Sequence, residues 1–133
     1  MSENLRLLIV DDDIEFLEIL ERRLSRRGFT VIAHTTCPEA LDAAGKQSFD
    51  AAVVDRTVPG GADLELVVRL KAIDSNLPII VLSGWNGPNY VEEAYAAGAR
   101  EYLAKPCALG DIEAAIQQPL GPSAAHLPVG EAP

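Results

Sequence analysis

Polar side chains that could carry chemistry stand directly after short apolar runs of the sequence. They are Asp11, Asp12, Asp13, Asp55, Ser83 and Lys105. Two carboxylates about 5 Å apart repel each other by about 3 kcal/mol at an effective dielectric constant of about 20. A cluster of carboxylates therefore needs a cation, a shifted protonation state or a chemical role that offsets this cost. Because no Cys or His adjoins the aspartates, the ion that they favour is a hard one such as Mg²⁺.

Taken together, these groups are the set that phosphoryl transfer to a carboxylate requires. With Asp55 as the nucleophile, attack on a phosphoryl donor gives an acyl phosphate. The transferred group spreads negative charge over its oxygens, so positioning and charge neutralisation carry the catalysis. A metal ion held by Asp11, Asp12 and Asp55 would cover one oxygen. Lys105 would neutralise a second oxygen, and the Ser83 hydroxyl would donate a hydrogen bond to the third.

The chemistry needs a fold that brings these positions to one edge. Five short apolar runs alternate with longer segments of helical period, and the runs lie at about 5–10, 30–33, 51–54, 78–82 and 101–104. Runs without polar alternation are typical of parallel strands that are covered on both faces. We therefore predict an α/β fold, a doubly wound parallel sheet of five βα units; the flavodoxin-like (βα)5 type with strand order 2-1-3-4-5 is what the family resemblance of the motifs below implies. The functional groups then gather at the carboxyl ends of the strands.

The segments between the runs show the periodicity of amphipathic helices. In the first segment an apolar face is formed by Phe16, Ile19, Leu20 and Leu24. Asp13 is predicted to cap the start of this helix, and Gly28 to end it. The other helices are expected at about 38–46, around Leu64–Val68, around Val91–Tyr95 and at about 109–118.

The composition fits one globular domain with a tail. The chain has 133 residues, of which 48% are hydrophobic, and this is enough for a single core. We expect the domain at residues 1–118 and a flexible, Pro-rich tail at 119–133. Lys and Arg total 11 against 20 Asp and Glu, and the resulting net charge of −9 argues against direct nucleic-acid binding.

No part of the sequence suggests a membrane segment, export or a disulfide. The aliphatic runs are far shorter than the ~20 residues of a membrane-spanning helix, and no basic stretch leads into an apolar one after Met1. A cytoplasmic protein without membrane contact is therefore expected. Cys37 and Cys107 follow strands at opposite edges of the predicted sheet, roughly 19 Å apart. A disulfide needs Cα atoms within about 7 Å, so both thiols should stay free.

Four motifs resemble the receiver domain of two-component response regulators, and the resemblance covers about residues 5–118. The motifs are LLIVDDD at 7–13, VVD at 53–55 with Pro59 four residues on, VLSG at 81–84 and AGAREYLAKP at 97–106. The last of these is especially specific. The resemblance implies a phosphoacceptor signalling domain of a bacterial His-Asp phosphorelay.

The resemblance also implies a role for individual residues of the metal site. Asp55 would be the phosphoacceptor, and Asp11 and Asp12 the acidic pair. The backbone carbonyl of Thr57 would be a further metal ligand. The implied ion is Mg²⁺, for which Mn²⁺ can substitute.

A second group of implied roles concerns switching. Ser83 and Lys105 would contact the phosphoryl group, and Tyr102 would turn when Ser83 is drawn toward that group. This rotation would change the surface formed by the fourth helix, the fifth strand and the fifth helix. The family's Lys–Pro bond is commonly cis, which is inexpensive for an X-Pro bond, and we expect the same at Lys105–Pro106.

The partners implied are a histidine kinase or a histidine phosphotransfer protein as the phosphoryl donor. An output domain or a separate target would read the switched surface, and a weak homodimer could also form there. The fifth helix is short and begins at a residue, Ala108, that caps poorly. The domain would be a switch that phosphorylates and dephosphorylates itself, not a turnover enzyme on an external substrate.

Three positions depart from the family's common pattern. Arg56-Thr57-Val58 follows the acceptor where aliphatic residues are more frequent, and Gly60-Gly61-Ala62-Asp63 replaces the usual ending in Asp-Gly. Trp85 is bulky at a position that commonly modulates hydrolysis, as Thr57 does. Our hypothesis is that Trp85 shields the acyl phosphate from water.

Two other functions remain as alternatives. In a small aspartate-nucleophile phosphatase Asp11 would be the nucleophile, but no acidic pair follows Lys105 and the chain has no room for a cap domain. A flavodoxin-like FMN carrier needs a Ser/Thr/Gly-rich phosphate loop after the first strand, and three aspartates there would repel the phosphate. A receiver that cannot be phosphorylated is opposed by the complete set of acidic residues and Lys105.

Overall fold

A computed structural model of the protein describes residues 5–85 and 87–118. Its strands are β1 (Arg6–Val10), β2 (Thr30–His34), β3 (Ala51–Asp55), β4 (Ile79–Ser83) and β5 (Glu101–Ala104). Its helices are α1 (Ile14–Arg26), α2 (Cys37–Lys46), α3 (Glu65–Ile73), α4 (Pro88–Ala97) and α5 (Leu109–Gln117). The strands pair in parallel in the order β2-β1-β3-β4-β5. The predicted flavodoxin-like α/β fold is confirmed, while the tail at 119–133 lies outside the described residues.

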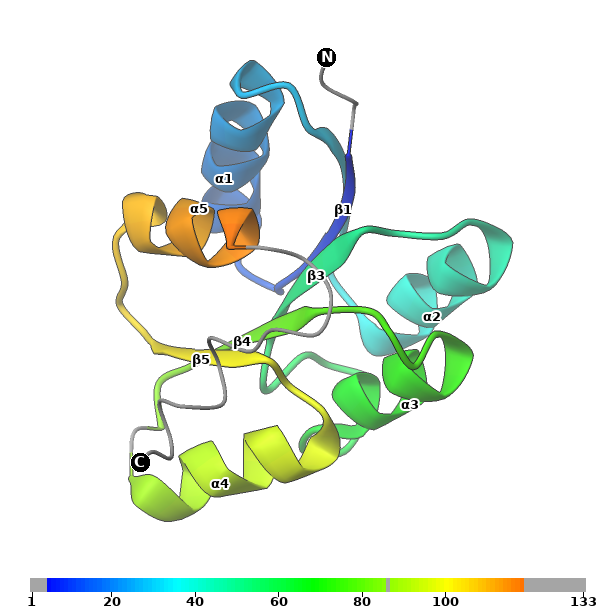
Figure 1. Ribbon diagram of the computed structural model, residues 1–133, viewed down its shortest axis with the longest axis vertical. Coiled ribbons are helices and arrows are strands. Elements are labelled where there is room, and N and C mark those ends of the chain that lie inside the picture. Colours follow the sequence, from blue (N-terminus) through cyan, green and yellow to red (C-terminus); the bar gives the residue numbers. More distant parts are fainter. Residues whose placement is uncertain (1–4, 86, 119–133) are drawn as a thin grey trace.

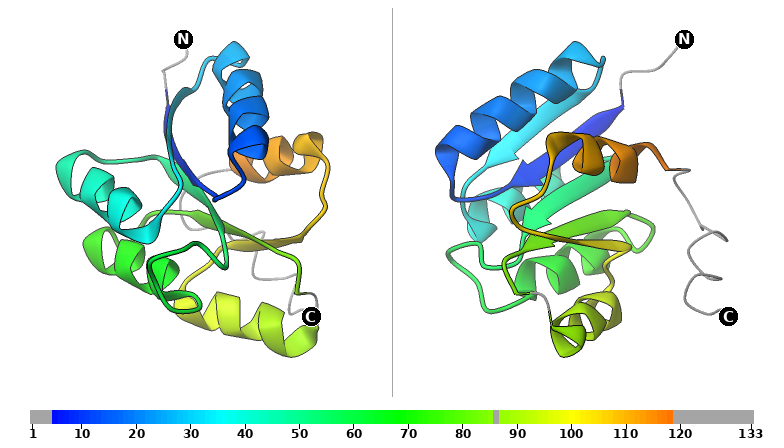
Figure 2. Two further views of the ribbon diagram at one scale, coloured as in Figure 1. Left: turned by 180° about the vertical axis from the view of Figure 1, so that it is seen from behind. Right: turned by 90° about the vertical axis from the view of Figure 1, so that its left-hand side faces the viewer.

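Helices cover both faces of the sheet. Helices α1 and α5 lie side by side on one face, and α2, α3 and α4 lie on the other (Figures 1 and 2). Each face has its own apolar cluster, one containing Leu20 and Ile112 and the other containing Leu70 and Ala94. Every residue of β3 and β4 is buried. This two-sided burial is why these strands read as unbroken apolar runs.

Local sequence signals fix where several helices begin and end. The Asp13 carboxylate accepts a hydrogen bond from the Phe16 amide at 3.1 Å, so Asp13 caps α1 as predicted. Thr36 caps α2 in the same way. Gly98 ends α4 with a φ of 120°, and a Cβ there would lie 2.8 Å from the Lys71 side chain. A residue with a side chain would therefore be both strained and crowded at this position.

The apolar face expected for α1 was partly wrong. Ile19 was placed on that face but is 50% exposed. Val68, expected only to lie in the third helix, is 51% exposed. The buried residues of α1 are Leu17, Leu20 and Leu24, and those of α3 are Leu66, Val67 and Leu70. Successive residues are turned by about 100° around a helix. Ile19 and Val68 each adjoin a buried residue in sequence and are therefore rotated away from the sheet.

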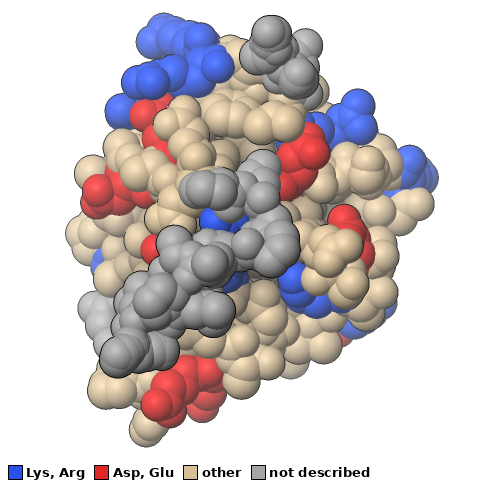
Figure 3. All heavy atoms as spheres, in the orientation of Figure 1, with Lys and Arg blue, Asp and Glu red and all other residues tan. Residues whose placement is uncertain are grey.

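A buried carboxylate ties α5 to α1. Glu113 on α5 is 6% exposed, and its oxygens lie 2.9 Å from Arg23 Nε and 3.5 Å from Arg27 Nη2. The hydrogen bond from Arg23 holds the pKa of Glu113 below its usual value. These arginines belong to a basic group at the end of α1, at the upper left of Figure 3, with Arg22 and Arg26 beside them.

Within the described residues, no helix is long and apolar enough to cross a membrane.

We expect the two faces of α1 to respond differently to truncation. Leu24 is fully buried, so Leu24→Ala should lower the free energy of unfolding by about 2–5 kcal/mol through lost transfer energy and a residual cavity. The matched control is Ile19→Ala on the exposed face, which should change it by less than about 0.5 kcal/mol. Urea denaturation of both variants measures this, and equal losses would contradict the assigned helix face.

Candidate functional site

Three carboxylates meet at the carboxyl ends of two neighbouring strands. Asp55 is the last residue of β3, and Asp11 and Asp12 follow β1, whose Val10 pairs with Val54. An oxygen of each carboxylate lies within 4.8 Å of an oxygen of the other two. Asp11 and Asp55 are buried, whereas Asp12 is exposed. The sheet thus brings these predicted site residues together, and their oxygens form a cluster that could hold a hard metal ion.

Lys105 links the two buried carboxylates. Its ammonium donates to Asp11 Oδ2 at 3.0 Å and to Asp55 Oδ2 at 3.5 Å. The other oxygen of each carboxylate accepts from backbone, Asp11 Oδ1 from the Asp13 amide at 2.9 Å and Asp55 Oδ1 from the Thr57 amide at 3.3 Å. Both carboxylates are therefore oriented from two sides. The Lys105–Pro106 peptide bond that follows is cis, as expected.

Burial and nearby charges shift the pKa values of Asp11 and Lys105. Burial raises the pKa of Asp11, although the hydrogen bonds from Asp13 and Lys105 oppose the shift. Burial alone would lower the pKa of Lys105, but the hydrogen bond to Asp11 and the charges of both carboxylates outweigh it, so this pKa is raised. Lys105 therefore stays protonated. With three carboxyl groups against one ammonium, the site has more acidic than basic groups, a balance that favours a divalent cation.

Ser83 and Tyr102 meet at the backbone of Trp85, not at the carboxylates. Ser83 ends β4, and its Oγ accepts from the Trp85 amide at 2.9 Å. The Tyr102 hydroxyl donates to the Trp85 carbonyl. Trp85 itself is 43% exposed, with its ring centroid 5.3 Å from that of Tyr90. The two predicted switch residues are thus joined through one backbone segment.

Arg56 is a buried residue that was not expected to take part in the site, and it lies between Asp55 and the exposed Thr57. The Arg56 side chain is wholly buried and pairs with Asp63 and Glu93. The hydrogen bond to Asp63 raises the pKa of Arg56 above its already high value. The one sequence feature that could have indicated a role for Arg56 is a charged residue directly after a buried strand. Its partners are remote in sequence, so spacing could not identify them.

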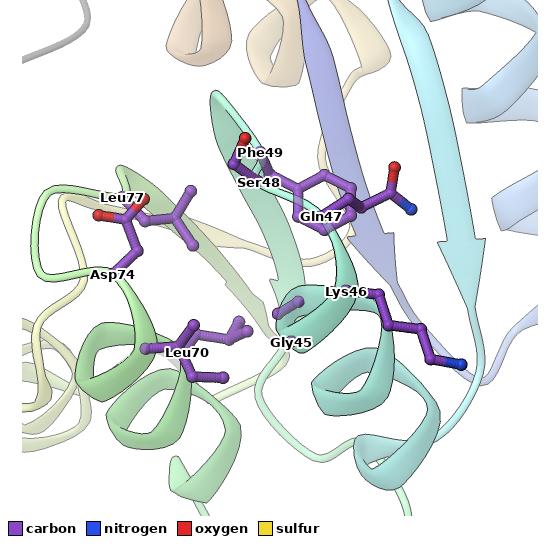
Figure 4. Close-up of a pocket in the computed structure, with 10 residues that line it drawn as sticks. Gly45, Lys46, Gln47, Ser48, Phe49, Leu70, Asp74 and Leu77 are labelled. Carbon is purple, nitrogen blue, oxygen red and sulfur yellow. The ribbon is translucent and has the colours of Figure 1, made fainter.

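A separate pocket lies at the other end of the sheet. It is bounded by the last turns of α2 and α3 and by the segment leading into β3, with Gln47, Phe49, Leu70 and Leu77 among its lining residues (Figure 4). Phe49 precedes β3, whereas Asp55 ends that strand. The pocket is therefore distinct from the carboxylate cluster.

The sequence matches the response regulator receiver domain family over residues 7–117. It is 36% identical to the transcriptional regulatory protein PrrA of Mycobacterium tuberculosis over 112 residues, which are 84% of this chain and 48% of that protein. It is 27% identical to sporulation initiation phosphotransferase F of Bacillus subtilis over 115 residues, 86% of this chain and 93% of that protein.

Comparison with solved structures also finds response regulators. A response regulator from Burkholderia pseudomallei, crystallised with a phosphorylated aspartic acid, a calcium ion and citrate, resembles this chain with a TM-score of 0.78 and 34% identity. The match covers 85% of this chain and 66% of that one. The chain belongs to the response regulator receiver domain family of two-component signalling. It spans about half the length of PrrA.

We expect divalent cations to bind this site more weakly as the pH falls. A protonated carboxyl is a poor ligand, and the pKa of Asp11 is raised by burial. Affinity should therefore be full above that raised pKa and be lost as the pH falls through it. Calorimetric titration with MgCl₂ from about pH 8 to about pH 4 measures this.

The variant Asp11→Asn should weaken binding by about 10–100-fold at the upper pH and flatten its pH dependence. The charge-matched control is Asp42→Asn, whose exposed carboxylate pairs with Lys46 on α2. An affinity that is the same across the pH range, or the same in both variants, would argue against this site.

Proposed function

We propose that Asp55 is the phosphoacceptor of this receiver domain and that a histidine kinase or histidine phosphotransfer protein is the donor. The single observation that carries the proposal is the Lys105 ammonium, which lies 3.0 Å from Asp11 and 3.5 Å from Asp55 at the strand ends. An amine so placed beside the nucleophile can neutralise an incoming phosphoryl oxygen. The family membership and the 27% identity to a sporulation phosphotransferase support this assignment.

The residues around Asp55 divide the work of the transfer. Asp55 Oδ1 accepts from the Thr57 amide, which orients the carboxylate for attack on phosphorus. Asp11, Asp12 and Asp55, with the Thr57 carbonyl, would hold Mg²⁺. When bound, this ion supplies positive charge next to a phosphoryl oxygen. Mn²⁺ offers the same coordination chemistry and should substitute.

Ser83 carries the response to phosphorylation. Its hydroxyl accepts from the Trp85 amide and donates to the Trp85 carbonyl at 3.5 Å, and it would instead donate to the acyl phosphate on Asp55. That exchange would pull on the Trp85 backbone and so on the Tyr102 hydroxyl that bonds it. Tyr102 is in β5 and thus lies in the surface formed by α4, β5 and α5. We expect an output domain, a target or a weakly bound second copy to read that surface, with no turnover of an external substrate.

The phosphatase alternative is not favoured by the geometry of Asp11. One of its oxygens accepts from the Asp13 amide at 2.9 Å, and the other accepts from Lys105 at 3.0 Å. Asp11 is also 1% exposed. Both oxygens of Asp55 are also engaged, but over longer distances, 3.3 Å from the Thr57 amide and 3.5 Å from Lys105, so Asp55 is the more readily freed to attack a donor.

We expect acetyl phosphate with Mg²⁺ to add one phosphate to the protein. Intact-mass analysis should show that adduct in the wild type, lose it in Asp55→Asn and retain it in the exposed control Asp42→Asn. Lys105→Ala should slow the transfer by about 100–1,000-fold, because a donor to the developing charge is lost. Phosphate retained in Asp55→Asn but absent in Asp11→Asn would favour the phosphatase assignment.

The Trp85 side chain should slow hydrolysis of the acyl phosphate. Removing the half-exposed ring in Trp85→Ala leaves the backbone contacts to Ser83 and Tyr102 in place, so the variant tests the ring alone. We expect dephosphorylation to be about three- to tenfold faster, up to about 1.4 kcal/mol in the barrier. The control is Tyr95→Ala, which removes an exposed ring further along α4. An unchanged or slower rate in Trp85→Ala would reject the shielding hypothesis.

A further inference from the structure

A buried arginine next to the phosphoacceptor gathers groups from four parts of the chain. The Arg56 side chain has no exposed surface, although it follows Asp55 directly. Its Nε and Nη2 donate to both oxygens of Asp63, at 2.7 and 2.9 Å. Nη2 also donates to Glu93 Oε1 at 2.6 Å, and Nη1 to the Tyr90 carbonyl at 2.8 Å. Such charge-assisted, bidentate contacts fix a guanidinium in one orientation.

Aromatic rings close over the same guanidinium. The Arg56 Cζ lies 5.4 Å from the ring centroid of Trp85 and 5.3 Å from that of Tyr90. These distances are within the range of cation–π attraction. The rings belong to the loop after β4 and to the first turn of α4. Arg56 therefore contacts the start of α4 in two ways, through the backbone carbonyl of Tyr90 and through the aromatic ring of Tyr90.

Within the part of the chain that the structure describes, α4 starts without a side-chain cap and buries little of its surface. Its N-cap is Gly87, which makes no side-chain capping hydrogen bond, and its one fully buried residue is Ala94. A cation near a helix N-terminus is disfavoured by the helix dipole. The acidic groups of Asp63 and Glu93, bonded directly to the guanidinium, offset that cost. The contacts at this end of α4 are thus centred on Arg56.

The same arginine reaches the switch residues. Arg56 Nη1 lies 3.5 Å from the Tyr102 hydroxyl, which donates to the Trp85 carbonyl. The Trp85 amide in turn donates to Ser83 Oγ. A continuous chain of contacts therefore runs from the residue after Asp55 to Tyr102 and on to Ser83.

We propose that Arg56 is a positioning residue that holds Tyr102 and the first turn of α4 in place before phosphorylation. The inference rests on the proposed function, because it takes Ser83, Tyr102 and α4 to be the parts that read Asp55. Phosphorylation then stabilises an arrangement that Arg56 has already set. The response of Tyr102 and α4 to the phosphoryl group is correspondingly small in the wild type, and it grows when Arg56 is removed.

The test compares variants of the full, unphosphorylated chain. Arg56→Met replaces the buried cation by an apolar side chain of similar length, and Glu93→Gln removes one exposed partner. The control is Arg69→Met, which removes an exposed arginine that pairs with Glu65 on α3. Hydrogen exchange is measured for the amides of α4 and of α1. Tyr102 is observed by ¹⁹F NMR after incorporation of 3-fluorotyrosine, with its signal assigned through Tyr102→Phe.

In Arg56→Met we expect exchange of the α4 amides to rise about tenfold, equivalent to about 1.4 kcal/mol, with α1 unchanged. The Tyr102 signal should shift or broaden in the same variant. Glu93→Gln should give a smaller change of the same sign, and Arg69→Met none. Beryllofluoride with Mg²⁺, a stable mimic of the phosphoryl group, should then move the Tyr102 signal further in Arg56→Met than in the wild type.

The inference is overturned if α4 exchange and the Tyr102 signal of Arg56→Met match the wild type, or if α1 and α4 exchange rise together. Should Arg56→Met fail to fold, Glu93→Gln decides, and wild-type exchange in that variant overturns the inference. These readouts need no phosphoryl transfer. A wild-type chain that takes up no phosphate from acetyl phosphate would therefore contradict the assignment of Asp55 and leave the test of Arg56 intact.

Discussion

The ammonium of Lys105 between Asp11 and Asp55 is the interaction on which the site depends. Burying two carboxylates side by side carries a large desolvation cost, which a nearby cation offsets. Lys105 bonds both, at 3.0 and 3.5 Å, and thereby helps to orient them at the strand ends. The parallel sheet makes this possible, because it sets the ends of β1, β3 and β5 at one edge (Figure 1).

A second cation, the buried Arg56, belongs to the residue that directly follows Asp55. Lys105 faces the carboxylates of the site, whereas Arg56 faces Asp63, Glu93 and the rings over the start of α4. Because Arg56 follows Asp55 in the chain, any shift of the end of β3 acts on both sets of contacts. The division suits a receiver domain, in which one group of residues handles the phosphoryl group and another presents a surface to a partner.

The chain covers very different shares of its relatives. Sporulation initiation phosphotransferase F is matched over 93% of its length, whereas PrrA is matched over 48%. The first comparison is with a protein that is matched almost throughout, the second with one that is matched over about half its length. In both cases the matched portion is the receiver fold. The residues of the site thus all belong to this one sheet and the loops that follow its strands.

Sequence alone determined the strands, their order, the Asp13 cap, the cis Lys105–Pro106 bond and the edge where the site residues meet. Those features follow from apolar runs, short-range signals, the rules of parallel sheets and a family resemblance. Only the tertiary structure decided that Ile19 and Val68 face outward, because periodicity defines a stripe but packing selects its centre. It also decided the contacts of Arg56, whose partners Asp63, Glu93 and Tyr102 lie 7, 37 and 46 residues away. A buried guanidinium is stable only where folding brings such groups together, and no spacing in the sequence encodes that meeting.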